Sequence, residues 1–181
     1  MPLIPFINEK LAEKYDLNET FTESELESKS INKENILILG NYDDLQINDF
    51  RINSNSAYDL RVGDEYWCRE VSFSLQKGDE ITLKPGDFFC VQTIESIIMP
   101  KFRVGLIVSK VSALLNGFGV TTTKVDPGYR GPLVIYTYNY SSKNVKLKWG
   151  DKFCSLLIFS VDEDIIPYAK EAKKVPSSTR V

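Results

Sequence analysis

Short turn signals recur along most of this chain, and they constrain its fold more than any other feature. They separate runs rich in Val, Ile, Thr, Tyr and Phe, which favour β-strands. The signals are Lys77-Gly78-Asp79, Lys84-Pro85-Gly86, Met99-Pro100-Lys101, Asp126-Pro127-Gly128, Ser141-Ser142-Lys143 and Trp149-Gly150-Asp151. Strands at short, regular spacing with turns between them are typical of a sandwich or barrel. We therefore expect an all-β fold, either a distorted β-barrel or a jelly roll.

The expected organisation is one β-domain with an extension at each end. The domain is expected over residues 36–165, and its one predicted helix covers residues 109–116, with Gly117 as the residue that closes it. Residues 1–35 read as an N-terminal arm and connector, because residues 18–34 are rich in Glu, Ser, Asn and Lys. Within this arm, residues 8–15 have the spacing of a short helix. Residues 166–181 lack a packing pattern and are expected to be a mobile tail.

Composition excludes several classes of function. The net charge of −3 argues against a broad nucleic-acid-binding surface. The chain has no histidine, so catalytic triads and zinc sites that need histidine are excluded. Its three cysteines, Cys68, Cys90 and Cys154, lie apart in strand-like runs and are expected to be free thiols in a reducing compartment. No apolar run is long enough for a membrane span and no signal peptide is evident, so we expect a cytoplasmic protein.

The segment from Gly117 to Asn139 is the strongest functional signal. Two β-rich runs, VTTTKV and PLVIYTY, flank Asp126-Pro127-Gly128-Tyr129, where Pro fixes φ and Gly permits a positive φ. The runs predict a hairpin whose turn presents a carboxylate, Asp126, and an aromatic ring, Tyr129. Such a hairpin is suited to holding a flat polar ligand beside a carboxylate that acts as a base. An ordinary reverse turn is the alternative.

This segment, VDPGYRG, resembles the third sequence motif of the dUTPase and dCTP deaminase superfamily. Other pieces resemble further motifs in the family's order: SAYDLRVG at residues 56–63, SKVSAL at residues 109–114 and WGDKFCSL at residues 149–156. The resemblance covers roughly residues 53 to 160. It implies a dUTPase-like β-barrel that assembles as a homotrimer with its sites between subunits.

The resemblance also implies a role for each matching residue. Asp126 takes the place of the aspartate that orients the attacking water and contacts the 3′-hydroxyl. Tyr129 takes the place of the ring that packs on deoxyribose and excludes a 2′-hydroxyl. The backbone from Gly117 to Thr123, which includes Val120 and Thr121, would pair with the pyrimidine edge.

The expected phosphate site departs from the family pattern. Where the family has Arg-Ser, this chain has Lys110 and Val111, and only Lys110 keeps the positive charge. Ser112 and the first amides of the short helix are further candidates for phosphate contact, whereas a solvated lysine is the alternative for Lys110. Asp59 takes the place of an aspartate near the metal–triphosphate site, with a structural carboxylate as the alternative. Mg²⁺ is implied as the cofactor, carried by the triphosphate.

Three departures argue against deamination. The residue five positions after Gly131, where the deaminases have their catalytic Glu, is Tyr136. The serine and arginine of the deaminases' second motif are replaced by Val111 and Leu115.

The C-terminal part departs from the family pattern as well. Ser155 stands where the fourth motif usually has Gln. The Gly-rich C-terminal arm of dUTPases is missing, and the polar stretch at residues 177–180 is either a reduced arm or merely a tail.

The function expected from the sequence is therefore hydrolysis of dUTP to dUMP and pyrophosphate with Mg²⁺. The expected ligand is a deoxyuridine nucleotide, with neither nucleic acid nor membrane as a partner. The first alternative is a catalytically reduced homologue that binds a nucleotide or a protein partner without turnover. Deamination of dCTP is the third possibility and is disfavoured.

Overall fold

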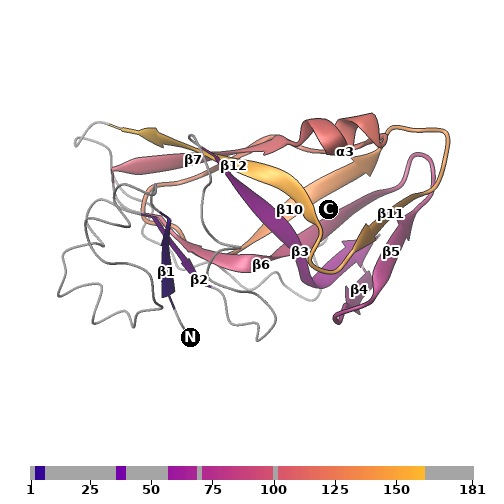
Figure 1. Ribbon diagram of the computed structural model, residues 1–181, viewed down its shortest axis with the longest axis horizontal. Helices are drawn as coiled ribbons and strands as arrows, with labels where there is room; N and C mark the ends of the chain where they lie inside the picture. Colours follow the sequence, from indigo (N-terminus) through magenta and orange to yellow (C-terminus); the bar gives the residue numbers. More distant parts are fainter. Residues whose placement is uncertain (1–2, 7–35, 40–56, 69–70, 100–101, 162–181) are drawn as a thin grey trace.

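The computed structural model describes residues 3–6, 36–39, 57–68, 71–99 and 102–161. Within these residues, strands dominate, and most of them form one curled antiparallel sheet of ten strands (Figure 1). The strands are β1 (Leu3–Phe6), β2 (Ile36–Leu39), β3 (Ala57–Cys68), β4 (Val71–Ser74), β5 (Glu80–Leu83), β6 (Phe88–Ile98), β7 (Arg103–Ser109), β8 (Phe118–Val120), β9 (Thr123–Val125), β10 (Arg130–Asn139), β11 (Val145–Lys148) and β12 (Lys152–Ser160).

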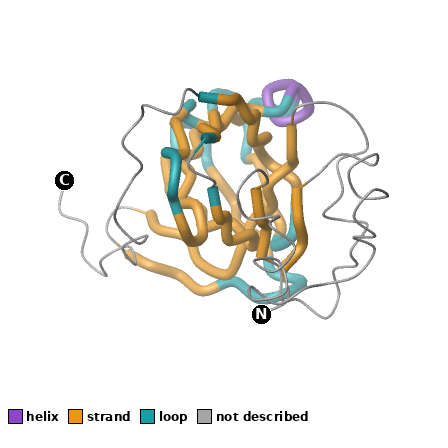
Figure 2. The backbone as a smooth tube through the Cα atoms, turned by 90° about the vertical axis from the view of Figure 1, so that its left-hand side faces the viewer, coloured by secondary structure: helices purple, strands orange, loops and turns teal. Residues whose placement is uncertain are grey.

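The order of strands in the sheet differs from their order in the chain. The main path is β1-β2-β6-β3-β12-β7-β9, with β10 paired to both β6 and β8, and β4 paired to β3. Strands β5 and β11 form a separate antiparallel pair. Figure 2 shows the strands curling around a common interior, with the helix at one edge. The all-β, barrel-like fold expected from the sequence is confirmed.

Alternating side chains explain why these segments form strands around one core. In β10, Ile135, Thr137 and Asn139 are buried, whereas Tyr136 and Tyr138 between them are exposed. The pair β5 and β11 alternates in the same way, with apolar side chains inward and Glu, Thr and Lys outward. Successive side chains of a strand point to opposite faces, so this pattern fixes which face meets the core. Each fully buried apolar side chain contributes about 1.5–3 kcal/mol to folding.

The short helix expected within the body is confirmed as α3 (Val111–Leu115). It begins directly after β7 and ends before Gly117, which has a φ of 86°. A Cβ atom at Gly117 would lie 2.4 Å from the Cβ of Ser141, so both the backbone angle and the close approach require glycine here. Among the described residues, no helix is long and apolar enough to cross a membrane.

The hairpin expected around Asp126 is present only at its base. Val120 of β8 lies opposite Thr137 of β10, and the Thr121 amide donates to the Tyr136 carbonyl at 2.9 Å. Beyond this point the two runs separate: β9 pairs with β7 instead of with β10, whereas β10 pairs with β6 along most of its length. The expectation of a closed hairpin is therefore wrong. Residues 126–129 instead join the two separated strands.

Several expectations fall outside the described residues. These are the short helix at residues 8–15, the connector at residues 18–34 and the tail at residues 166–181. Within the N-terminal arm, Leu3–Phe6 are described, and they pair antiparallel with β2 at one end of the sheet.

Candidate functional site

Asp126 and Tyr129 lie on an ordered turn, as the sequence predicts. The Tyr129 amide donates to the Asp126 carbonyl at 3.1 Å, and Gly128 between them has a φ of 81°. Two backbone hydrogen bonds attach the turn to Met99: the Met99 amide donates to the Tyr129 carbonyl, and the Gly128 amide donates to the Met99 carbonyl. The turn is therefore held by the residue that follows β6 and does not depend on a hairpin.

The two functional groups of this turn differ in their surroundings. The Asp126 carboxylate is partly exposed and forms an ion pair with Lys124. The Tyr129 ring is half-buried against the core, and its hydroxyl donates to the Pro132 carbonyl. A fixed ring beside an accessible carboxylate is an arrangement that can position a ligand next to a base.

Lys110, Asp59 and Ser155 form a second polar group. Lys110 follows β7, Asp59 lies in β3, and Ser155 lies in the strand between them, β12, directly opposite Asp59. The Lys110 ammonium pairs with one oxygen of Asp59, and the Ser155 hydroxyl donates to the other at 2.7 Å. Burial favours the neutral acid, but the hydrogen bonds from Lys110 and Ser155 outweigh it and lower the pKa of Asp59. Asp59 thus holds the expected phosphate-binding lysine.

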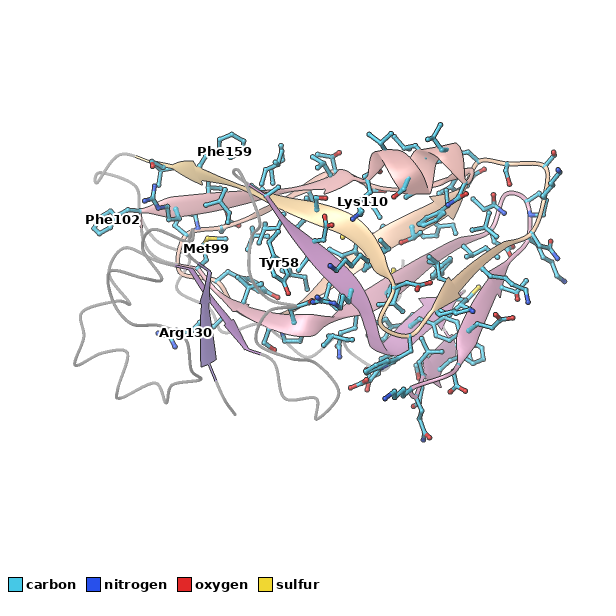
Figure 3. The ribbon with its side chains drawn as sticks, in the orientation of Figure 1. Tyr58, Met99, Phe102, Lys110, Arg130 and Phe159 are labelled. Carbon is cyan, nitrogen blue, oxygen red and sulfur yellow. The ribbon has the colours of Figure 1, made fainter. Side chains whose placement is uncertain are left out.

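The turn with Asp126 and the polar group around Lys110 lie far apart in a single chain. Val125, the residue before Asp126, is opposite Gly105 near the start of β7, whereas Lys110 follows the end of that strand. Five residues of extended strand correspond to about 15–20 Å. Figure 3 shows Lys110 near the middle of the molecule and Arg130, next to Tyr129, near one end.

Most of the expected base-binding backbone is already hydrogen-bonded. Gly117 accepts from the amides of Tyr140 and Ser141, and Val120 exchanges hydrogen bonds with the Ser109 hydroxyl. Thr121 is exposed, and its amide is used by Tyr136. Residues 121–122, which belong to neither β8 nor β9, are the part of this segment that lies outside a strand.

The structure places the remaining phosphate candidate, Ser112, on the exposed surface of α3. The helix has only five residues, and its N-cap, Lys110, makes no side-chain cap hydrogen bond. Val111 and Leu115, at the positions of the deaminase serine and arginine, are also exposed.

Tyr136 occupies an exposed position on the outer face of β10. Its ring stacks on Phe88 with centroids 5.3 Å apart, and its hydroxyl is hydrogen-bonded to Cys90. The charge of a Cys90 thiolate and partial burial raise the pKa of Tyr136, so the hydroxyl stays protonated at neutral pH. Among the described residues, the neighbours of Tyr136 named here are an aromatic ring and a thiol. Neither takes the place of the deaminase carboxylate.

A buried polar network is the feature that sequence reasoning missed. Arg61 pairs with Glu95 at 2.7 Å, and both side chains are almost fully buried. The Tyr58 hydroxyl donates to Glu95 at 3.1 Å and accepts from Arg61 at 2.8 Å. Burial raises the pKa of Tyr58 far above its usual value, so it remains a donor. Charged residues within apolar strand runs were the sequence signal for this network. Their pairing could not be predicted, because the partners lie far apart in the sequence.

The described residues do not form a metal site of their own. No group of three His, Cys, Asp or Glu side chains within the described ranges could hold an ion. The one acid expected near a metal, Asp59, already has Lys110 and Ser155 on its two oxygens. The donor set present therefore does not fit a protein-bound Mg²⁺.

Comparisons with known proteins agree with this fold. The sequence profile of the dCTP deaminase-like family matches residues 21–161. The dCTP deaminase of Pyrococcus horikoshii is 27% identical over 108 residues, which are 60% of this chain and 69% of the relative. The dCTP deaminase of Thermococcus kodakarensis is 28% identical over 107 residues, covering 59% and 69% of the two chains.

Two solved structures share the fold at low sequence identity. The dCTP deaminase from Agrobacterium tumefaciens has a TM-score of 0.54 and 15% identity, and the match covers 69% of this chain but only 43% of that one. A point mutant of the dUTPase from phage phi11 of S. aureus, which coordinates a structural Mg(II) ion, has a TM-score of 0.53 and 16% identity over 78% of this chain and 96% of its own. These structures confirm the dUTPase-like fold. Because the family profile spans most of the sequence, the chain belongs to the dCTP deaminase-like family, within the superfamily that also contains the dUTPases.

Proposed function

We propose that this protein hydrolyses dUTP to dUMP and pyrophosphate. The observation that carries the proposal is the contrast between Asp126 and Tyr136. Asp126 is an accessible carboxylate on a turn fixed by backbone hydrogen bonds, which suits a residue that orients water. Tyr136 stands at the position of the deaminase acid, and a phenol that stays protonated cannot shuttle protons to cytosine as a carboxylate does.

In the proposed reaction, Asp126 orients a water molecule and accepts its proton. The water oxygen forms a bond to the α-phosphorus, and the bond from that phosphorus to the oxygen bridging the α- and β-phosphates breaks. Pyrophosphate leaves with the electron pair of that bond. Lys124, paired with Asp126, keeps a positive charge beside the carboxylate. Positioning of this kind contributes about 10²–10⁴-fold to a rate.

The other groups bind the substrate. Tyr129 packs on the deoxyribose with the exposed part of its ring, and the segment at residues 121–122 meets the pyrimidine. Lys110 contacts the triphosphate while Asp59 and Ser155 hold its ammonium group in place. An ammonium is a point charge without the bidentate fork of arginine, so this contact is weaker than the family pattern would give.

The site is completed by a second copy of the chain, and the proposed assembly is a homotrimer. Asp126 and Lys110 are about 15–20 Å apart along β7. One triphosphate is too short to contact both residues of a single copy. Mg²⁺ would be brought by the triphosphate, since the described residues provide no cage for it. No step of the proposed reaction is assigned to the ion.

A second candidate is a homologue that binds a deoxynucleotide without turnover. Lys110 is already neutralised by Asp59, and Val111 brings no hydroxyl to the phosphate site. Both features weaken binding of the triphosphate and favour slow turnover or none. Binding would remain possible through the Asp126–Tyr129 turn.

The proposal is tested by following pyrophosphate and ammonia in parallel with dUTP, dCTP and dTTP as substrates. We expect pyrophosphate from dUTP and no ammonia from dCTP. Ammonia release would establish deamination and overturn the proposal. Binding of a deoxynucleotide without either product would establish the second candidate.

A further inference from the structure

A cavity of about 200 Å³ lies between β5, β4 and the adjoining ends of β3 and β6. Figure 1 shows β4 and β5 at the end of the molecule opposite β1 and β2. Among the described residues that line the cavity, none belongs to the Asp126–Tyr129 turn or to the group formed by Lys110, Asp59 and Ser155. The proposed hydrolysis therefore does not account for it.

The cavity lies where two sheets come together without pairing. Strand β5 pairs with β11 in the small sheet, whereas β4 pairs with β3 in the large one. All four residues of β5, Glu80–Leu83, line the cavity, although successive side chains of a strand point to opposite faces. The edge of β5 therefore faces the cavity, and a strand edge presents backbone N–H and C=O groups that can bind a ligand.

The inner wall of the cavity is aromatic and apolar. Tyr66 of β3 lies opposite Phe73 of β4, and their rings stack with centroids 4.8 Å apart. The almost fully buried Phe89 meets the Tyr66 ring edge-on at 6.2 Å. Two buried aliphatic side chains, Ile81 and Leu83, complete this lining. An apolar cavity of about 150 Å³ in another protein holds benzene, so this cavity has room for one aromatic ring with a short substituent.

The outer part of the cavity is acidic. Glu80 is exposed and Asp87 partly exposed, and none of the described residues that line the cavity is Lys or Arg. Glu80 pairs through Oε1 with Lys146, and Asp87 accepts through Oδ2 from the Lys84 amide. Each contact uses one of the two carboxylate oxygens. An exposed ion pair such as that of Glu80 with Lys146 is weak, so a second cation can share the carboxylate.

We propose that this cavity binds a small organic cation, a protonated amine carried on a single aromatic ring. The ring of the ligand packs against Tyr66, Phe73 and Phe89, whose faces also attract a positive charge. Its ammonium group donates to Glu80, to Asp87 and to backbone carbonyls at the edge of β5, which matches the three donors of an ammonium. The two carboxylates repel an anionic ligand. The proposal goes beyond the proposed hydrolysis and does not rest on it.

The first test compares three probes of similar size that differ in charge: phenethylamine, phenethyl alcohol and hydrocinnamate. Binding to the full chain is measured by isothermal titration calorimetry at pH 7, where the amine is protonated as a lysine side chain is. We expect phenethylamine to bind about tenfold more tightly than the alcohol, or better, because hydrogen bonds between charged groups are the stronger ones. Hydrocinnamate should not bind. Absence of phenethylamine binding, or equal binding of the three probes, would overturn the proposal.

Variants test whether the binding site is this cavity. Glu80→Gln with Asp87→Asn removes both charges at nearly constant shape and should weaken phenethylamine binding about tenfold or more. Phe73→Ala should weaken it by removing a ring. The matched controls, Glu65→Gln on β3 and Phe159→Ala on β12, change exposed side chains that do not line the cavity (Figure 3) and should bind as the wild type does. Circular dichroism checks that each variant is folded. Equal losses in variants and controls would contradict the assignment.

A further measurement needs no substitution. Cys68 lines the cavity, whereas Cys90, which is also partly buried, does not. Phenethylamine should slow alkylation of Cys68 by iodoacetamide and leave that of Cys90 unchanged, as followed by mass spectrometry of the peptides. Equal effects on the two thiols, or no effect on either, would place the amine elsewhere. None of these experiments uses a nucleotide, so failure of this proposal and failure of the proposed hydrolysis are seen separately.

Discussion

Lys110 is ion-paired with Asp59, although the two residues lie 51 positions apart in the sequence. Ser155 donates a hydrogen bond to the second oxygen of the same carboxylate at 2.7 Å. Three strands meet at this point, because Lys110 follows β7 and the other two residues lie in β3 and β12. The cluster therefore fixes the end of β7, where α3 begins, and it sets the direction of the lysine ammonium.

The Asp59 cluster predicts a specific dependence of stability on pH. The pKa of Asp59 is lower in the folded chain than its unfolded value of about 4, so the ionised acid stabilises the fold above that pH. This stabilisation is lost as the pH falls through the folded pKa. Ser155→Ala removes one donor and brings the folded pKa closer to the unfolded one. We expect it to lower the free energy of unfolding at pH 7 by more than at pH 2.

Urea unfolding of Ser155→Ala and wild type at several pH values measures this difference. The control is Ser74→Ala, because Ser74 is exposed on β4 and removing its hydroxyl should have a small, pH-independent effect. A difference between Ser155→Ala and wild type that is the same at pH 2 and pH 7 would show that Ser155 acts by packing alone.

Asp126→Asn tests the proposed water-orienting residue. The fold should be retained, because the turn is closed by the Asp126 carbonyl and the Lys124 pair is a surface one. Turnover should fall by about 10²–10⁴-fold, since an amide cannot accept the proton of water. Pyrophosphate release and the melting temperature are measured together. Full activity in this variant would assign the role to another group.

The buried pair of Arg61 and Glu95 predicts a large effect on stability. Arg61→Met leaves the Glu95 carboxylate buried without its cation and should lower the free energy of unfolding by about 3–5 kcal/mol. Lys146→Met breaks the exposed pair with Glu80 and should cost less than about 1 kcal/mol. Chemical denaturation of both variants gives the comparison. Equal losses would mean that Glu95 finds other partners or a proton.

Gly117 and Gly78 separate two reasons why a position requires glycine. Both have positive φ, but a Cβ at Gly78 meets nothing within 4 Å, whereas one at Gly117 meets Ser141 at 2.4 Å. Gly78→Ala should cost about 1–2 kcal/mol for the backbone conformation. Gly117→Ala should cost about 1–3 kcal/mol more, because Ser141 must also move. Thermal unfolding measures both, and equal costs would show that the loop containing Ser141 adapts freely.

The sequence predicted the fold and the turn because their determinants are local. Alternating side chains define the strands, and Pro127 with Gly128 defines the turn. The pairing of β9 with β7 was not predictable in this way, since strand partners are chosen by contacts between distant segments. For that reason the hairpin expectation failed at its tip while the turn itself was correct.

The residues of the candidate site could be named from the sequence, where they stay a prediction, but their arrangement could not. The motif resemblance named Asp126, Tyr129, Lys110 and Asp59, and it did so without indicating that Lys110 and Asp59 bind each other. Nor does it give the distance from Asp126 to Lys110, which follows from the register of β7 with β9. Lys110 follows β7, whereas Asp59 lies in β3 and Ser155 in β12, so only the folded sheet brings these three side chains together.

Lys110 and Val111 limit how tightly the proposed site can bind a phosphate. Lys110→Arg supplies a bidentate donor that can bind Asp59 and a phosphate at once, and Val111→Ser adds a hydroxyl at the position after it. Val111 is 73% exposed, so its replacement removes little packing from the fold. A charged hydrogen bond contributes about 1.5–3 kcal/mol when it is available to the transition state. We expect the double variant to release pyrophosphate from dUTP about tenfold faster, or more.

Two controls make this result interpretable. Val111→Ser alone shows how much of the gain comes from the hydroxyl without the new arginine. Adding Asp126→Asn to the double variant should remove the gain, because a tighter phosphate grip helps only when water is oriented for attack. If the double variant is instead slower than the wild type, the Lys110–Asp59 pair is itself a working phosphate site, adapted to this chain's own geometry. If the gain survives Asp126→Asn, the new arginine and serine act independently of the proposed site.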